Sequence, residues 1–204
     1  MMSTIVLASN NAGKLAEFSA LVTPLGVELV PQAQLGVTEA NEPYATFIEN
    51  ALAKARHASA HTGLPALADD SGLCVRALNN APGVYSARYA QRHQAGRGDE
   101  ANNAYLLRQL QNVDPDQRQA CFVAVLVYVR HATDPLPLIA QGLWWGQIAP
   151  QAAGPHGFGY DPIFYIPALG RTAAELSAAE KNQHSHRAQA LRTLLTDLTP
   201  LYRS

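Results

Sequence analysis

The stretch Pro65-Ala66-Leu67-Ala68-Asp69-Asp70-Ser71-Gly72-Leu73-Cys74-Val75 decides the fold. Its apolar flanks predict a buried strand, yet its centre carries two carboxylates. A buried carboxylate without a partner is costly, so such groups are paired, hydrogen-bonded or bound to a metal. Successive strand residues point to opposite faces, so Asp69 and Asp70 should do different jobs, with a basic neighbour or a water expected beside Asp69. The alternative is a tight Asp-Ser-Gly turn between two short strands.

The composition of the 204 residues predicts one globular domain, residues 1–204, with room for two lobes and a substantial core. A net charge of −1 argues against a nucleic-acid partner. Cys74 and Cys121 lie in apolar segments without metal-ligand spacing, as expected in a reducing compartment. A signal-peptide pattern is missing, and the longest apolar run, residues 121–129, is too short to cross a bilayer. We therefore expect a cytoplasmic protein without a membrane partner.

Hydrophobic periodicity predicts strands and helices in alternation. The expected strands outside the acidic stretch are Thr4–Ala8, Gly26–Val30, Arg118–Arg130 and Leu136–Trp145, the last two forming an antiparallel pair. The expected helices follow Lys14, run from Pro43 to about His61, cover Asp99–Gln111 and Thr172–Lys181, and start again near Ser185. Two signals compete at the second helix, because Pro43 suits a first helical position and Thr46-x-x-Glu49 is a capping box.

The loop Ser9-Asn10-Asn11-Ala12-Gly13-Lys14 joins the first strand to the first helix. This arrangement aims backbone N–H groups and a helix N-terminus at one point, which suits a phosphate, and Lys14 adds a positive charge. The pattern is not a P-loop, and an ordinary asparagine helix cap is the alternative. Lys54, four residues after Asn50, is a second cation for an anionic ligand if its helix face borders a cleft, and otherwise a solvated lysine.

Two later segments also carry polar or aromatic groups in unusual settings. Glycines on both sides of Phe158 leave its ring prominent, so that it could stack on a flat ligand, although the ring could equally pack inward. Ser185-His186-Arg187 begins the final helix, where the helix dipole disfavours a cation. Arg187 is therefore more easily understood if it reaches an external acceptor.

Taken in order, six segments resemble the inosine triphosphate pyrophosphatase family, which includes dITP/XTP pyrophosphatases. They are Ser9-x-Asn11-x-x-Lys14, Glu42 ahead of Thr46-Phe47-x-Glu49-Asn50-Ala51-x-x-Lys54-Ala55, Ala68-Asp69-Asp70-Ser71-Gly72-Leu73, Pro82-Gly83-Val84-Tyr85-Ser86-Ala87-Arg88-Tyr89, Gly157-Phe158-Gly159-Tyr160-Asp161-Pro162 and Lys181-Asn182-x-x-Ser185-His186-Arg187. Together they span nearly the whole chain.

The resemblance implies an α/β fold with a long twisted central mixed sheet, flanking helices, and two lobes with a nucleotide cleft between them. It implies a homodimer that hydrolyses ITP, dITP or XTP to the monophosphate and pyrophosphate with Mg2+, removing deaminated purines from the nucleotide pool. A triphosphate is strongly anionic, which Lys14, Lys54 and Lys181 can offset. Mg2+ needs only one or two carboxylates, which Glu42 and Asp70 supply.

The resemblance also assigns roles residue by residue. Asp70 matches the proton acceptor and a metal ligand, Glu42 matches a second metal ligand, and Lys54 matches a lysine near the phosphates. The substrate contacts match Ser9, Asn10, Asn11, Ala12, Gly13, Lys14, Ser71, Phe158, Gly159, Tyr160, Asp161, Lys181, His186 and Arg187. A carboxylate on Mg2+ should be a poor base, because the cation lowers its pKa, so the base role of Asp70 rests on the resemblance alone.

Base selection follows from hydrogen-bond chemistry. His186 and Arg187 offer donors that suit the O6 and N7 acceptors of a 6-oxopurine. Adenine carries an amino donor at position 6 and would leave them unpaired.

Three other functions compete with this prediction. A septum-inhibition-related pyrophosphatase shares the general fold, but Phe158-Gly159-Tyr160-Asp161 and Ser185-His186-Arg187 argue against it. A nucleotide-binding regulator without turnover is disfavoured because Glu42, Asp70 and the lysines are all present together. A haloacid-dehalogenase-type phosphatase needs Asp-x-Asp after the first strand, where this chain has Ser9-Asn10-Asn11.

Overall fold

The computed structural model describes residues 3–202, apart from the side chains at positions 12, 17 and 21. The chain forms two compact units. The first contains residues 3–70, 124–142 and 187–202, and the second contains residues 71–123 and 143–186. The chain passes between them within three strands, at positions 70–71, 123–124 and 142–143, and once at the join between residues 186 and 187.

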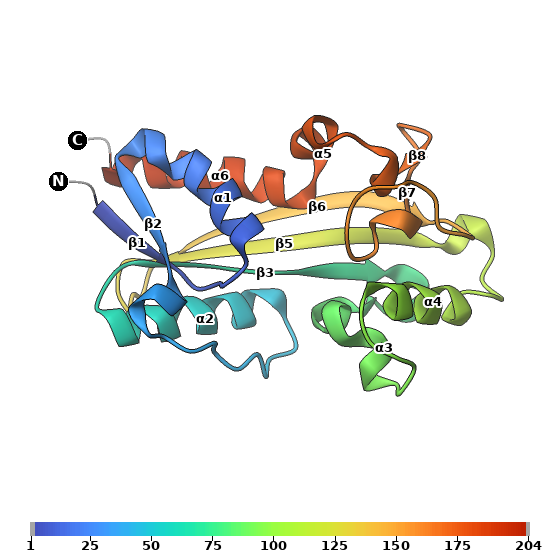
Figure 1. Ribbon diagram of the computed structural model, residues 1–204, viewed down its shortest axis with the longest axis horizontal. Coiled ribbons are helices and arrows are strands. Elements are labelled where there is room, and N and C mark those ends of the chain that lie inside the picture. Colours follow the sequence, from blue (N-terminus) through green and yellow to red (C-terminus); the bar gives the residue numbers. More distant parts are fainter. Residues whose placement is uncertain (1–2, 203–204) are drawn as a thin grey trace. The chain divides into compact units, whose positions relative to one another are not determined.

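Helices and strands alternate over residues 3–75, and after that several strands or helices follow one another directly (Figure 1). The helices are α1 (Ala12–Val22), α2 (Phe47–Thr62), α3 (Tyr89–Arg92), α4 (Asp99–Gln109), α5 (Ala178–His184) and α6 (His186–Tyr202). The strands are β1 (Ser3–Leu7), β2 (Val27–Pro31), β3 (Ala66–Val75), β4 (Ala81–Pro82), β5 (Gln119–Val129), β6 (Leu138–Ile148), β7 (Phe164–Ile166) and β8 (Arg171–Thr172).

The sheet is mixed, as predicted. Its strands are hydrogen-bonded in the order β2-β1-β3-β5-β6-β7-β8, with β4 paired to β3. Strand β1 is parallel to β2 and β3, whereas β4, β7 and β8 pair antiparallel with their neighbours. The Ile148 amide donates to the Arg118 carbonyl at 2.9 Å, joining the start of β5 to the end of β6 as the expected antiparallel pairing requires. The α/β class with a helix-flanked mixed sheet is confirmed.

In the first unit, α1 and α6 cover one face of the sheet and α2 lies on the other face (Figure 1). The packed core includes Phe18 of α1, Leu194 of α6, and Ile5, Leu67 and Leu126 of the strands. Burial of such large side chains stabilises the fold by about 1.5–3 kcal/mol each. The strands that carry the predicted site residues are therefore fixed by a well-packed core.

In the second unit, Leu106 of α4 and Leu110, which directly follows α4, are buried in a core that also contains Leu73 of β3, Phe122 of β5 and Phe164 of β7. Phe122 and Phe164 have ring centroids 4.4 Å apart. This core supports the loop between β6 and β7, which carries the predicted Phe158 segment.

Of the two competing starts of the second helix, the one at Thr46 is confirmed, whereas the single helix expected at Thr172–Lys181 is wrong. Helix α2 starts at Phe47 rather than Pro43, because the Thr46 side chain accepts from the Glu49 amide at 3.3 Å and caps the helix there. The expected helix Thr172–Lys181 is instead the end of β8, a 3-10 turn at Ala173–Glu175, and α5. Thr172 and Ser177 each form a capping box, and the second restarts the chain as α5.

Within the described part of the chain, every helix is too short or too polar to cross a lipid bilayer.

Candidate active site

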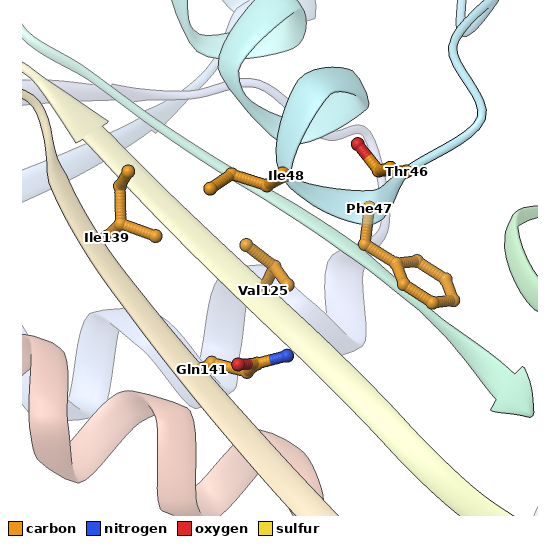
Figure 2. Close-up of a pocket in the computed structure, with 6 residues that line it drawn as sticks. All are labelled: Thr46, Phe47, Ile48, Val125, Ile139 and Gln141. Atoms are coloured by element: carbon orange, nitrogen blue, oxygen red, sulfur yellow. The ribbon is translucent and has the colours of Figure 1, made fainter.

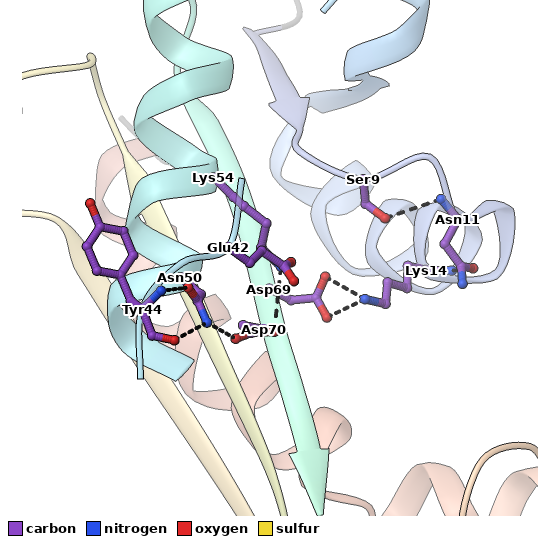
Figure 3. A network of polar contacts seen from close by, with 9 residues as sticks. All are labelled: Ser9, Asn11, Lys14, Glu42, Tyr44, Asn50, Lys54, Asp69 and Asp70. Carbon is purple, nitrogen blue, oxygen red and sulfur yellow. Dashed lines mark hydrogen bonds and ion pairs between the residues drawn. The ribbon is translucent and has the colours of Figure 1, made fainter. Parts of the chain in front are cut away.

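The two neighbouring aspartates of β3 are both buried but have different partners (Figure 3). The Lys14 ammonium lies 2.9 Å from Asp69 Oδ1 and 2.7 Å from Oδ2, so the predicted basic neighbour of Asp69 is confirmed. Burial alone would raise the pKa of Asp69, but the charge and hydrogen bond of Lys14 outweigh it, with help from Lys54 and Arg187, and the pKa is lowered. Asp69 is therefore an anion that holds Lys14.

Asp70 faces a different group of side chains. Its Oδ2 accepts a hydrogen bond from Asn50 Nδ2 at 3.2 Å, and its Oδ1 lies 3.6 Å from Lys54 Nζ. Burial raises the pKa of Asp70 to about 6, and the nearby Glu42 and Asp69 charges add to the rise, while Lys54 and Asn50 oppose it. This carboxyl therefore changes charge close to neutral pH.

Lys54 joins Glu42 to Asp70. Its ammonium donates to Glu42 Oε1 at 2.6 Å, and only 14% of its side chain is exposed. Burial lowers the pKa of Lys54, but the Asp70, Glu42 and Asp69 carboxylates more than compensate, so the net shift is upward. The alternative of a freely solvated lysine is therefore wrong.

The predicted phosphate loop leads directly into α1. Asn11 caps this helix, since its Oδ1 accepts from the Lys14 amide at 3.1 Å, and the Asn11 amide donates to Ser9 Oγ at 3.2 Å. Asn10 is exposed and donates to Glu39 Oε1 at 3.3 Å. The asparagine cap is confirmed, and it is compatible with the predicted phosphate site, because a capped helix start still presents N–H groups to an anion.

The first unit thus brings together Ser9, Asn10, Asn11, Lys14, Glu42, Lys54, Asp69 and Asp70. Glu42 and Asp70 share the Lys54 cation, so both carboxylates lie close to one positive charge. Both offer the carboxylate oxygens that Mg2+ prefers, so these residues fit the metal. Within residues 3–202, no cluster of three or more His, Cys, Asp and Glu side chains could hold a metal ion. Mg2+ commonly uses one or two carboxylates and completes its shell with water and phosphate oxygens.

In the second unit, hydrogen bonds to Asp161 stabilise the loop that carries Phe158. Asp161 Oδ2 accepts from the Phe158 amide at 2.9 Å and from Lys181 Nζ. A side chain at Gly157, whose φ is +91°, would come within 2.6 Å of that oxygen, so glycine is required there. The Phe158 ring is 60% exposed, with Lys181 Nζ 4.5 Å from its centroid. The prominent ring is confirmed, and the inward-packed alternative is wrong.

Residues of helix α4 also form hydrogen bonds with this loop. Asp99 accepts from the Gly159 amide at 2.7 Å, and Asn103 donates to the Gly159 carbonyl at 3.0 Å. Tyr160 is buried and donates to the Ser86 carbonyl at 2.8 Å, so its side chain belongs to the core. The loop is therefore fixed at the backbone amide and carbonyl of Gly159 and by the buried side chain of Tyr160.

The remaining predicted contacts lie where the chain changes unit. The His186 ring is buried and stacks on Phe122, with centroids 4.9 Å apart and an interplanar angle of 11°. Ser71 follows Asp70 directly in β3 and is partly exposed. Arg187 follows His186 and is half-buried, and its charge helps to lower the pKa of Asp69.

An open pocket of about 240 Å³ lies elsewhere in the first unit, beside the start of α2 (Figure 2). Its lining is Thr46, Phe47, Ile48, Val125, Ile139 and Gln141. The lining carries no formal charge and contains none of the predicted site residues, so it is a poor match for a triphosphate.

Sequence reasoning missed three residues that hold the site in place, namely Asn50, Asp99 and Asn103. Asn50 belongs to the second of the six matching segments and lies four residues before Lys54, but the sequence assigns it no role. Its burial inside a polar helix segment is a signal for a structural hydrogen bond, but its partners cannot be read from the sequence. Asp99 fits an ordinary first-turn acid, so its contact with Gly159 has no separate sequence signal.

Comparison with known proteins gives consistent matches. The model of the Ham1 family matches residues 5–197. A protein of Bordetella pertussis named dITP/XTP pyrophosphatase is 65% identical over 194 residues, which are 95% of this chain and 90% of that protein. A protein of the same name from Burkholderia pseudomallei is 63% identical over 196 residues, covering 96% of this chain and 93% of that protein.

Solved structures of similar proteins match this fold over nearly the whole chain. A HAM1 protein from Coxiella burnetii has a TM-score of 0.92 at 49% identity, covering 98% of this chain and all of that one. A nucleoside-triphosphatase, or dITP/XTP pyrophosphatase, from Mycobacterium abscessus has a TM-score of 0.79 at 47% identity, covering 94% of this chain and 98% of that one.

Proposed function

Because this chain belongs to the Ham1 family, we propose that it is a Mg2+-dependent pyrophosphatase that converts ITP, dITP and XTP to their monophosphates and pyrophosphate. The observation that carries the proposal is a pair of carboxylates, Glu42 and Asp70, which both lie close to the Lys54 ammonium. The Lys14–Asp69 ion pair lies beside them. The names of its relatives, dITP/XTP pyrophosphatase, support dITP and XTP as substrates.

The triphosphate is bound by the loop Ser9–Lys14 and by lysine charge. Backbone N–H groups at the start of α1 donate to phosphate oxygens, as helix N-termini commonly do. Lys14 is held by Asp69, so its ammonium is kept close to that loop rather than free in solvent. Preorganisation of this kind lowers the entropy lost when the substrate binds.

The reaction is attack of water on the α-phosphorus. The new bond joins the water oxygen to the α-phosphorus, the bond to the bridging oxygen of the β-phosphate breaks, pyrophosphate leaves, and the proton lost by the water passes to solvent. Glu42 and Asp70 would hold Mg2+, which supplies charge neutralisation for the leaving pyrophosphate and a lower pKa for bound water. Asp70 orients the attacking water, and the Lys54 ammonium offsets negative charge that develops on the phosphates.

The base is recognised by an aromatic face and by donors. The exposed Phe158 ring stacks on the purine, a contact that contributes about 1–3 kcal/mol per base in single-strand binders. His186 and Arg187 donate to O6 and N7 of a 6-oxopurine, and the stacking of His186 on Phe122 restricts its ring. ATP is rejected because its 6-amino group would face these donors. GTP shares O6 and N7 with the substrates, so its rejection depends on its 2-amino group.

The same proposal extends to the setting of the enzyme. The protein acts as a homodimer in the cytoplasm, and its role is to remove deaminated purine nucleotides before a polymerase uses them. Small nucleotides, rather than nucleic acids or membranes, are its partners, in keeping with its near-neutral charge.

Product analysis tests the proposal. ITP, XTP, dITP, GTP, ATP and dTTP are incubated with the protein in Mg2+ and in EDTA, and the products are separated by anion exchange. Metal-dependent release of pyrophosphate from ITP, dITP and XTP, with ATP and GTP nearly untouched, is the expected result. Release of orthophosphate, or turnover of dTTP alone, would overturn it.

A further inference from the structure

Asn50 makes three hydrogen bonds with one buried amide. Asn50 as a whole residue is only 1% exposed. Its Oδ1 accepts from the Tyr44 amide at 3.1 Å, and its Nδ2 donates to the Tyr44 carbonyl at 3.3 Å and to Asp70 Oδ2 at 3.2 Å. These partners allow one orientation of the amide, because only the oxygen can face an N–H group and only the nitrogen can face two acceptors.

The three bonds join two segments that carry the proposed metal ligands (Figure 3). Tyr44 lies two residues after Glu42 in the chain that precedes α2, and Asp70 lies in β3. Asn50 therefore ties the backbone beside one carboxylate directly to the other carboxylate. Neither segment is joined to the other by sheet hydrogen bonds, since residues 36–46 contain no strand.

Lys54 stands one helical turn further along α2 and connects Glu42 to Asp70 through charge. A metal cation at the two carboxylates would compete with the Lys54 ammonium, because both are positive. The neutral amide of Asn50 has no such conflict. Asn50 can keep its hydrogen bonds when the cation is bound, which Lys54 cannot do to the same degree.

We propose that Asn50 is a positioning residue that sets the separation of Glu42 and Asp70 for the divalent cation. The inference rests on the metal site of the proposed function. Residues that hydrogen-bond to metal ligands typically contribute 10- to 100-fold to metal affinity or activity. We expect an effect of this size for Asn50, although it would contact neither metal nor nucleotide.

The test uses Asn50→Ala in the full chain, with Asn102→Ala as a matched control. Asn102 is also a buried helix asparagine, and it also binds two backbone groups, the Ala90 amide at 2.8 Å and the Ala87 carbonyl at 3.2 Å. Binding of Mn2+ alone is measured by electron paramagnetic resonance, and exchange of the Tyr44 amide hydrogen is measured without metal. If Asn50→Ala folds poorly, Asn50→Ser is measured in its place.

Asn50→Ala should weaken Mn2+ binding at least tenfold and speed exchange at Tyr44, whereas Asn102→Ala should do neither. Activity should then need at least tenfold more Mg2+, with KM for ITP at saturating Mg2+ unchanged within threefold. A lower melting temperature with unchanged Mn2+ affinity would show a merely structural role and overturn the inference, as would a wild-type protein that binds no Mn2+. A wild-type protein that binds Mn2+ but hydrolyses no nucleotide would overturn the proposed function and leave the Mn2+ comparison decisive for Asn50.

Discussion

Lys14 and Asp69 are 55 positions apart in the chain, yet the lysine ammonium lies within 2.9 Å of both carboxylate oxygens. Asp69 is 2% exposed, so its charge depends on this partner. The pair joins the start of α1 to the middle of β3. It therefore connects the proposed triphosphate loop to the strand of the proposed metal ligand.

Removing either partner should have unequal effects. Lys14→Met leaves Asp69 buried without its main cation and should lower the free energy of unfolding by about 3–5 kcal/mol. Asp69→Asn removes the charge but keeps the shape, and should cost about 1–3 kcal/mol. Urea unfolding at pH 7.5 measures both. If Lys14→Met is as stable as the wild type, the pair contributes nothing to the fold.

The raised pKa of Asp70 makes stability depend on pH. Because folding raises this pKa from 3.8 to about 6, its stabilising contribution is complete below pH 3.8 and is lost as the pH rises through 6. The free energy of unfolding of Asp70→Asn, relative to that of the wild type, should therefore rise as the pH is raised from 4 to 8 in EDTA. The rise should be about 3 kcal/mol at the stated shift. Unfolding curves at both pH values measure the gain. The exposed Asp197→Asn is the control, and an equal response of the two variants would contradict the assignment.

The exposed ring of Phe158 should matter for binding rather than for the fold. Phe158→Ala should raise KM for ITP about tenfold, as loss of one stacking contact predicts, with little change in melting temperature. Leu136→Ala removes another exposed apolar side chain and serves as the control. Steady-state kinetics with unchanged KM would show that the ring does not touch the nucleotide.

Arg187 should control selectivity more than rate. Arg187→Ala should lower the ratio of kcat/KM for ITP over ATP about tenfold or more, since a good base contact is worth about 1–3 kcal/mol of discrimination. Arg192→Ala, on the exposed side of the same helix, is the matched control. The ratio is measured by mixing both nucleotides in one reaction, and a ratio equal to the wild type's would refute the role.

Much of the fold could be predicted because local patterns carry it. The buried acidic strand, the alternation of strands and helices over residues 3–75, and the Thr46 cap each depend on a few neighbouring residues, and all are present. The helix expected at Thr172–Lys181 is wrong because both caps form, five residues apart, so that the first starts only a 3-10 turn and the second starts α5.

The site shows a sharper limit of sequence reasoning. Opposite directions for Asp69 and Asp70 follow from strand geometry, and their separate partners agree with it. The bridge from Asn50 to Tyr44 and Asp70 depends on the register between α2 and β3, which no local pattern encodes. The nucleotide cleft, the homodimer and the metal remain predictions.

The most direct test of the central claim is hydrolysis of ITP in water labelled with oxygen-18, followed by mass spectrometry of the products. Attack at the α-phosphorus predicts one labelled oxygen in the inosine monophosphate and none in the pyrophosphate at the moment of release. Label in the pyrophosphate, or release of labelled orthophosphate, would contradict the account, because water would then attack a phosphorus other than the one that the proposed mechanism requires.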